Sequence, residues 1–217
     1  MNLEQARTNM IKQQLRTWEV LDSRVLDVLG TVAREDFVPT RHRRLAFSDM
    51  RLPLGHGQVM MKPSEQGRLL QSLALEGGER VLEVGTGSGF LTACLAKLGA
   101  AVTSIEIIES LARQAADNLA AHDIEDAALV TGDILQSNFE PGSFDAVVVT
   151  ASVASVPENL AALLRPGGRM FIVRGKSPAM EALLITRTES GKLSEDSLFD
   201  TDLPRLIGAE DAPEFRF

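Results

Sequence analysis

The chain has 217 residues, of which 44% are hydrophobic and 24% are charged, and its formal net charge is −8. These values are typical of one globular domain and exclude disordered and collagen-like chains. The sequence carries no basic arm or tail that would neutralise a phosphate backbone, so nucleic acid is not an expected partner.

Cysteine and histidine are scarce. Cys94 is the single cysteine and cannot form an intramolecular disulfide, and with three histidines in the chain we expect no metal site. No apolar run approaches the roughly 20 residues that a membrane-spanning helix needs, and the polar N-terminus lacks the apolar core of a signal peptide. We therefore expect a soluble, cytoplasmic protein with no membrane partner.

The first 79 residues are predicted to hold helices and one long loop. Residues 3–17 are polar and favour a helix, and Asp22 is expected to cap a second helix because apolar side chains follow it at helical spacing. Prolines and glycines interrupt residues 40–63, which we interpret as a long loop, and a loop of this length in a compact domain is usually either functional or disordered. Ser64 is expected to cap a third helix over residues 65–75.

From residue 80 onward, short apolar segments alternate with helical ones. Strands are predicted over residues 81–84, 102–106, 128–131, 144–149 and 169–174, with helices over 89–98, 109–121 and 158–164 between them. This alternation is typical of parallel strands joined by crossover helices on both faces of a sheet. Two further strands, over 183–186 and 197–199, have no helix between them and indicate an antiparallel edge.

A glycine-rich segment, Glu83-Val84-Gly85-Thr86-Gly87-Ser88-Gly89, joins the first of these strands to a helix. Glycines at such a turn let the backbone approach a ligand closely. Phe90 occupies the place of the third glycine in the dinucleotide-binding pattern, and the Gly-Lys-Ser/Thr ending of a phosphate-binding P-loop is missing. A tight strand-to-helix turn without a ligand is the alternative interpretation.

Polar side chains follow the next strands where ligands of open α/β sheets bind. Glu106 ends the second strand, 21 residues after Gly85, and is placed to accept hydrogen bonds from ribose hydroxyls. Asp133 follows the third strand and is a candidate acceptor for an adenine amino group. Thr150 ends the fourth strand, beside the reacting end of such a ligand. Each acid is alternatively a helix cap or a solvated turn residue.

Together with Pro166-Gly167-Gly168, these residues resemble the pattern of class I methyltransferases over residues 80–175. The resemblance implies S-adenosyl-L-methionine as cofactor and a Rossmann-like α/β fold, in which a seven-stranded, mostly parallel sheet has an antiparallel edge and N-terminal helices. The implied cofactor-binding residues are Glu83, Gly85, Thr86, Gly87, Ser88, Gly89, Glu106, Ile107, Asp133, Ile134 and Thr150.

Five segments resemble one family of that class, the protein-L-isoaspartate O-methyltransferases. They are Arg34–Pro39, Ala46–Asp49, Leu52–Gln58, Val81–Phe90 and Val156–Leu160, in the order of the family. The resemblance implies a protein-repair enzyme that methylates the free α-carboxylate formed when asparagine or aspartate rearranges to isoaspartate. The expected partner is a protein or peptide with a free carboxylate, with a small molecule as the alternative.

The acceptor side departs from the family. Met61 stands where the family carries a serine and Val59 where it carries a threonine, so the catalytic residue is unassigned. His56, Val59, Met61 and Lys62 are expected to belong to a lid over the acceptor. Lys62 is a candidate ligand for the acceptor carboxylate or a solvated lysine, and His56 either lines the cleft or is a hydrogen-bonded loop histidine.

The sequence predicts one domain over residues 1–217, made of N-terminal helices and lid (1–79), a cofactor-binding core (80–175) and the antiparallel edge (176–217).

Loss of one hydroxyl weakens a hydrogen bond to a charged group by about 1.5–3 kcal/mol, which predicts a slower or re-targeted enzyme. Two other interpretations stay open, because fold does not fix function. One is a methyltransferase with a different acceptor, and the other is a cofactor-binding module without turnover.

Overall fold

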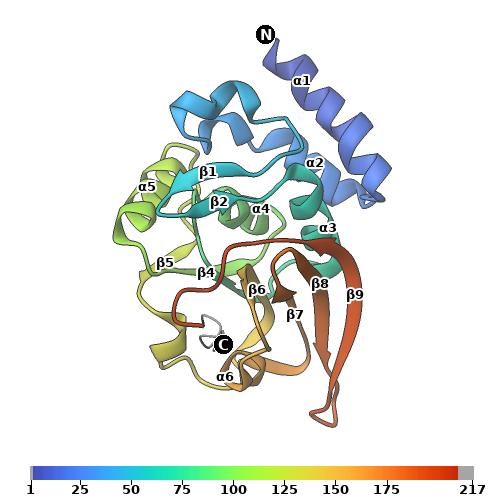
Figure 1. The fold of residues 1–217 in the computed structure, drawn as a ribbon, viewed down its shortest axis with the longest axis vertical. Helices are drawn as coiled ribbons and strands as arrows, with labels where there is room; N and C mark the ends of the chain where they lie inside the picture. The colour runs from blue at the N-terminus through green and yellow to red at the C-terminus, as the bar shows by residue number, and fades with distance from the viewer. Residues whose placement is uncertain (1, 210–217) are drawn as a thin grey trace, which may run out of the picture.

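A seven-stranded sheet forms the centre of the computed structural model, which describes residues 2–209 (Figure 1). Its strands are β3 (Arg80–Val84), β4 (Ala101–Glu106), β5 (Ala128–Thr131), β6 (Phe144–Val153), β7 (Leu164–Lys176), β8 (Ala179–Arg187) and β9 (Leu193–Thr201). They lie in the order β5-β4-β3-β6-β7-β8-β9. Pairing is parallel from β5 through β7 and antiparallel from β7 to β9. The expected fold class is confirmed.

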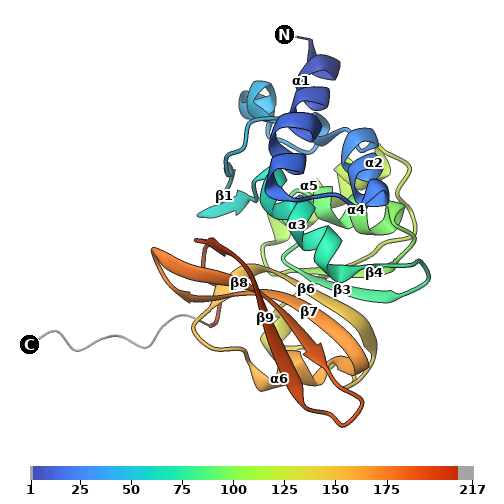
Figure 2. The ribbon, with the colours of Figure 1, turned by 90° about the vertical axis from the view of Figure 1, so that its right-hand side faces the viewer.

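Helices cover both faces of this sheet. They are α2 (Ser23–Thr31), α3 (Pro63–Leu73), α4 (Phe90–Lys97), α5 (Glu109–Ala120) and α6 (Glu158–Ala162). Figure 2 shows α2 to α5 on one side of the sheet and α6 on the other. Successive strand residues point to opposite faces, so Val81 and Val148 join the core under α2 to α4, while Leu82 and Val147 join the core under α6.

The chain begins with helical turns, as predicted. Helix α1 (Leu3–Asn9) continues as a π-helical turn (Met10–Leu15) and a 3₁₀ turn (Arg16–Trp18). The side chain of Asp22 accepts hydrogen bonds from the backbone N–H groups of Arg24, at 2.8 Å, and Val25, at 3.2 Å. The predicted cap of the second helix is therefore confirmed.

The segment 40–63 is not the long loop that we expected. It contains a 3₁₀ helix (Thr40–Leu45) and an antiparallel hairpin of β1 (Leu52–Gly55) and β2 (Gln58–Met60). At the tip of the hairpin, Gly55, His56 and Gly57 all have positive φ, between 53° and 104°. Two glycines make such a tight reversal sterically accessible. The sequence did not reveal the hairpin because its strands are too short to show a clear two-residue alternation of polar and apolar residues.

The prediction that Ser64 caps the third helix was wrong. Helix α3 begins at Pro63 with Lys62 as its N-cap residue, because proline suits the first helical position, where no N–H donor is needed. Ser64 lies inside the first turn, and its hydroxyl donates to Asp49 Oδ1 at 2.6 Å. It therefore joins the helix to the segment before β1.

The C-terminal part forms the expected antiparallel edge and then turns back over the sheet. After β9, residues 202–207, here called the closing segment, cross the end of β6 (Figure 1). Ser152 N–H donates to Pro204 O at 2.8 Å, and Leu206 N–H donates to Ser152 O at 2.9 Å. Residues 210–217 of the predicted edge lie outside the described residues. Between residues 2 and 209, no helix is long and apolar enough to cross a membrane.

A buried arginine links the N-terminal segments to the core. Arg34 is 1% exposed, and its Nε and Nη2 donate to the backbone oxygens of Ala46 and Met61, each at 2.7 Å. Its Nη1 donates to Gln66 Oε1, and its guanidinium lies 4.9 Å from the ring centre of Phe90. Burial lowers the pKa of Arg34 to about 10, so the side chain stays charged at neutral pH.

Replacing this arginine is expected to destabilise the fold strongly. Arg34→Met removes the donors to two buried carbonyls and to Gln66, which predicts a loss of about 3 kcal/mol or more in the free energy of unfolding. Urea unfolding measures it. Arg44 is exposed, so Arg44→Met is the matched control with an expected change within about 0.5 kcal/mol. Equal stability of the two variants would contradict the role given to Arg34.

Candidate active site

One depression of the described surface lies where the carboxyl ends of β3, β4 and β6 meet. This is the point at which the strand order reverses, and ligands of open α/β sheets bind there. The depression, here called the switch-point cleft, has an empty volume of about 730 Å³ including its mouth, within the range of small-molecule sites. The β1–β2 hairpin and the closing segment supply its other walls.

The cleft brings together most of the residues expected to bind the cofactor. Those on its wall are Glu83, Gly85, Thr86, Gly87, Ser88, Glu106, Ile107 and Thr150. Asp133 and Ile134 line a smaller adjoining pocket together with Ile107 and Glu106. Gly89 lines neither pocket. It is the N-cap residue of α4, and a Cβ there would lie 3.2 Å from Leu119 on α5.

The glycine loop is shaped by contacts with β6. Gly85 has a φ of +92°, and a Cβ on this residue would collide with Thr150 Oγ1. Thr150 Oγ1 in turn donates to Gly85 O at 2.8 Å, so the loop lies directly against the end of β6. Gly87 has a φ of +56°, which favours glycine. Gly85 and Gly87 line the cleft together with Thr86 and Ser88.

Glu106 fastens this loop to the end of β4. Its Oε2 accepts from Gly87 N–H at 2.9 Å, and its Oε1 accepts from Ile108 N–H at 3.0 Å. A carboxylate has about four lone-pair sites, so both oxygens retain capacity for hydroxyl donors in the cleft. The side chain is 5% exposed, and this low exposure favours a fixed acceptor.

Glu83 is a buried acid on the floor of the cleft. Its Oε2 accepts from Ser104 Oγ at 2.6 Å and from Thr92, while no described group donates to its Oε1. Burial raises the pKa of Glu83 to about 7, the charge of Glu106 adds to the rise, and the hydroxyls of Ser104 and Thr92 oppose it. A buried carboxylate oxygen without a hydrogen-bond donor would suit a cationic ligand group, which would supply the missing donor.

Asp133 adopts one of the two roles that the sequence left open for it. It caps a short 3₁₀ helix, with Oδ1 accepting from Leu135 N–H at 2.9 Å and Oδ2 accepting from Gln136 Nε2 at 2.8 Å. Its role toward adenine stays a prediction. In the part of the chain that the structure describes, no cluster of three His, Cys, Asp or Glu side chains is placed to hold a metal ion.

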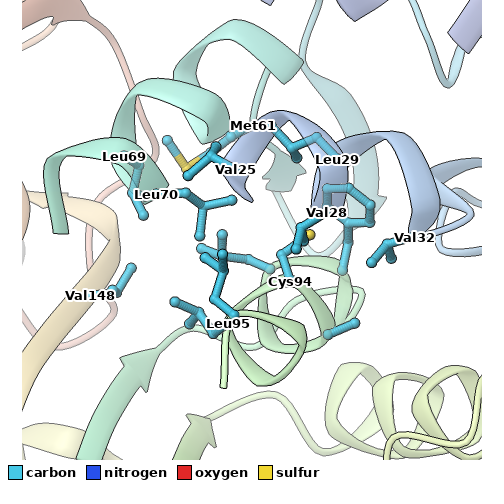
Figure 3. Close-up of a cluster of buried hydrophobic side chains, with 14 of the residues drawn as sticks. Val25, Val28, Leu29, Val32, Met61, Leu69, Leu70, Cys94, Leu95 and Val148 are labelled. Carbon is cyan, nitrogen blue, oxygen red and sulfur yellow. The ribbon is translucent and has the colours of Figure 1, made fainter. Parts of the chain in front are cut away.

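The four expected lid residues separate into two pairs. Val59 and Met61 line the cleft, and Met61, only 2% exposed, also packs in the core beside Val25 and Leu70 (Figure 3). His56 and Lys62 are not among the residues that line it.

His56 and Lys62 each bond elsewhere. The Nε2 of His56 lies 2.9 Å from Ser110 Oγ on α5, which makes it a hydrogen-bonded loop histidine. Lys62 donates its backbone N–H to Glu65 Oε2 at 3.1 Å, and its Nζ lies 3.9 Å from Glu65 Oε1. This ammonium group is therefore directed to the protein's own carboxylate.

Among the cleft residues that the sequence analysis did not identify are two polar ones, Gln66 and Arg205. Gln66 is 4% exposed, its Oε1 accepts from Arg34, and no described oxygen accepts from its Nε2. Arginine has only donors, so the bond to Arg34 fixes which end of the amide faces the cleft. No local pattern marks Gln66, because its partner lies 32 residues away.

The sheet order, the switch-point cleft and the glycine loop together define a Rossmann-like methyltransferase. The sequence model of the family described as protein-L-isoaspartate(D-aspartate) O-methyltransferase matches residues 5–202. The chain therefore belongs to this family, and the enzyme class expected from the sequence is confirmed. The expected cofactor, S-adenosyl-L-methionine, is the cofactor of the family.

Curated relatives share the family name. The chain is 39% identical over 206 residues to protein-L-isoaspartate O-methyltransferase 1 of Rhodopseudomonas palustris, covering 94% of this chain and 84% of the relative. It is 44% identical over 165 residues to the protein of the same name from Anaeromyxobacter sp., covering 76% and 78%. A Plasmodium falciparum protein of that description, crystallised with S-adenosyl-L-homocysteine, has the same fold, with a TM-score of 0.79 at 23% identity, over 95% of this chain and 98% of that one.

Removing the carboxylate of Glu106 is expected to weaken cofactor binding. Glu106→Ala takes away the acceptor predicted for the ribose hydroxyls and also releases the glycine loop, so S-adenosylhomocysteine affinity is expected to fall by about 1–3 kcal/mol. Isothermal titration measures it. Glu109 is exposed in the first turn of α5 and pairs with Arg113, so Glu109→Ala is the control. Unchanged affinity in Glu106→Ala would remove the assignment.

The raised pKa of Glu83 predicts a pH dependence of stability. On unfolding, this acid regains a pKa near 4.5, so its contribution to stability is full below pH 4.5 and is lost as pH rises through about 7. Between pH 4.5 and 8 the wild type should lose roughly 3 kcal/mol more than Glu83→Gln, which keeps an acceptor for Thr92 and Ser104. Urea unfolding at several pH values tests this. Parallel pH profiles would show that Glu83 ionises normally.

Proposed function

We propose that this protein transfers a methyl group from S-adenosylmethionine to the α-carboxylate of isoaspartyl residues in damaged proteins and peptides. The observation that carries the proposal is the switch-point cleft itself, with a glycine loop and two acids on one wall and the β1–β2 hairpin on the other. Family membership and the names of the curated relatives support the acceptor.

The cofactor side of the cleft fits an adenosyl amino acid. Glu106 would accept from the ribose hydroxyls, and the methionine part would lie along Gly85 and Gly87, which line the cleft. The unpartnered Oε1 of Glu83 would accept from the amino group of the cofactor. When bound, the cofactor supplies an electrophilic methyl group on a sulfonium centre.

The acceptor side acts by positioning. A carboxylate is ionised at neutral pH and attacks without a general base. The main task of the protein is therefore to orient the carboxylate toward the methyl group, and such orientation lowers the activation barrier by up to about 7–11 kcal/mol. Gln66 presents its Nε2 donor to the cleft, held there by Arg34, and would bind one oxygen of the acceptor carboxylate. Val59 and Met61 exclude water from the same wall but donate no hydrogen bond.

The amide of Gln66 can be tested with an isosteric change. Gln66→Glu keeps an oxygen acceptor for Arg34 but replaces the Nε2 donor by a second acidic oxygen, which repels an acceptor carboxylate. We expect the KM for an isoaspartyl peptide to rise at least about tenfold, or about 1.4 kcal/mol, with S-adenosylhomocysteine affinity within twofold of wild type. A tritiated-methyl assay and titration measure both. An unchanged KM would exclude Gln66 as the donor.

The apolar wall predicts slow turnover of isoaspartyl peptides, because Val59 and Met61 offset little of the desolvation cost of a carboxylate. Restoring both hydroxyls, with Met61→Ser and Val59→Thr together, is expected to raise turnover at least about tenfold, equivalent to ~1.4 kcal/mol. Met61→Ser also removes core packing, so Val59→Thr alone is the stable companion variant, and assays run well below the melting temperature.

The two variants also discriminate between the candidate functions. Wild-type turnover equal to that of a relative with both hydroxyls would show that the hydroxyls are dispensable. Background turnover in the double variant with cofactor bound would point to a different acceptor.

A further inference from the structure

The tip of the β1–β2 hairpin is bonded to the first turn of α5. The Nε2 of His56 at the tip lies 2.9 Å from Ser110 Oγ, and the two residues are 54 positions apart in the chain. Figure 1 shows the hairpin reaching from the N-terminal segments to the side of α5. Because the hairpin is a separate two-stranded sheet, this bond joins two segments that no strand pairing connects.

Both bonded segments supply walls of the switch-point cleft. Leu54 of the hairpin lies against the glycine loop, since a Cβ on Gly87 would lie 3.1 Å from its Cδ1. Glu106 joins that loop to the start of α5, because it accepts from the backbone N–H groups of Gly87 and Ile108. The hairpin therefore covers the part of the cleft that holds Glu106. The lining residues on either side of the bond are Leu54, Gln58 and Val59 from the hairpin, and Ile107, Ile108 and Leu111.

The base of the hairpin is fixed, whereas its tip stands in open space. At the base, Leu52 is fully buried, and the backbone oxygen of Met61 accepts from Arg34 at 2.7 Å. At the tip, a Cβ on Gly55 or on Gly57 would meet no described atom within 4 Å. The hairpin is therefore least restricted at its tip, where the bond between His56 and Ser110 holds it to α5.

We propose that the hydrogen bond between His56 and Ser110 is a latch, which holds the hairpin over the bound cofactor and opens before S-adenosylhomocysteine leaves. This inference rests on the placement of the cofactor in the switch-point cleft, which is part of the proposed function. His56 and Ser110 do not line the cleft, so they act as positioning residues and not as ligand contacts. A latch of this kind changes the rates at which a ligand enters and leaves more than it changes the affinity.

The chemistry of this pair suits a bond that forms and breaks in every catalytic cycle. A serine hydroxyl both donates and accepts, so Ser110 bonds to the imidazole of His56 in either tautomer. Both side chains are exposed, so water replaces the bond when it opens and its net contribution is small. Because opening of a lid or release of product limits turnover in many enzymes, such a latch sets how fast the cofactor is exchanged.

Two variants remove the latch from either side. His56→Asn keeps a residue type that tolerates the positive φ of the tip, but its side chain is shorter than an imidazole. Ser110→Ala removes the hydroxyl, which does not cap α5. Surface plasmon resonance on the full chain gives the rate constants for S-adenosylhomocysteine binding and release. We expect both rate constants to rise about threefold to tenfold in each variant, with the Kd within about twofold of wild type. The double variant should be no faster than the faster single variant, because all three lack the same bond.

Matched controls and a second measurement locate the effect. Ser110→Thr keeps a hydroxyl and should retain the wild-type rates. The Nε2 of His42 accepts from its neighbour Arg41 at 3.0 Å and does not line the cleft, so His42→Asn should leave the rates unchanged. Amide hydrogen exchange of residues 54–59 should be at least threefold faster in both latch variants, while residues 81–84 of β3 exchange as in wild type.

The outcomes separate this inference from the proposed function. Release rates that stay at the wild-type value in both variants would overturn the latch, even if isoaspartyl peptides are methylated. Faster release with unchanged binding rates, or with unchanged exchange in the hairpin, would also overturn it, because it would indicate a direct contact with the ligand. Faster binding and release together with a more mobile hairpin would support the latch, and failure to methylate isoaspartyl peptides alongside would count against the proposed acceptor alone.

Discussion

The acceptor side of this protein depends on one buried guanidinium whose hydrogen bonds go to neutral acceptors. Arg34 retains its charge at neutral pH, and a buried charge is tolerated only when its donors are satisfied. The acceptors are two backbone oxygens, those of Ala46 and Met61, and the amide of Gln66. These acceptors belong to the segment before β1, the end of the hairpin and the start of α3, so their hydrogen bonds to Arg34 hold the three segments together. The lid is thus placed from within the core.

The two halves of the site are built by different means. On the cofactor side, Glu106 and the glycine loop belong to neighbouring strands of one sheet, so parallel pairing alone brings them together. On the acceptor side, the residue before the hairpin and helix α3 meet the end of β9 through Arg51, Glu65 and Thr201, which are up to 150 residues apart. Changes at Val59 and Met61 therefore alter the acceptor wall without altering the sheet that holds the cofactor residues.

This difference explains how much could be predicted from the sequence. The sheet follows from apolar segments that repeat between helices, and the glycine loop with Glu106 follows from positions at strand ends, so both were accessible to local reasoning. The β1–β2 hairpin was missed because its strands have three or four residues. Gln66 and Arg205 were missed because contacts with Arg34 and Ser152, distant in sequence, give them their places.

The closing segment has a consequence for the order in which the protein is made. Pro204 and Arg205 line the switch-point cleft and are bonded to Ser152 in the sheet, yet they follow all seven strands and the hairpin in the chain. A nascent chain that has reached Thr201 already contains these strands but lacks this wall of the cleft. The closing segment is added roughly a second later, given elongation at about 5–20 residues per second. Synthesis therefore completes the sheet before it completes the cleft, and a chain cut before residue 202 would lack the wall altogether.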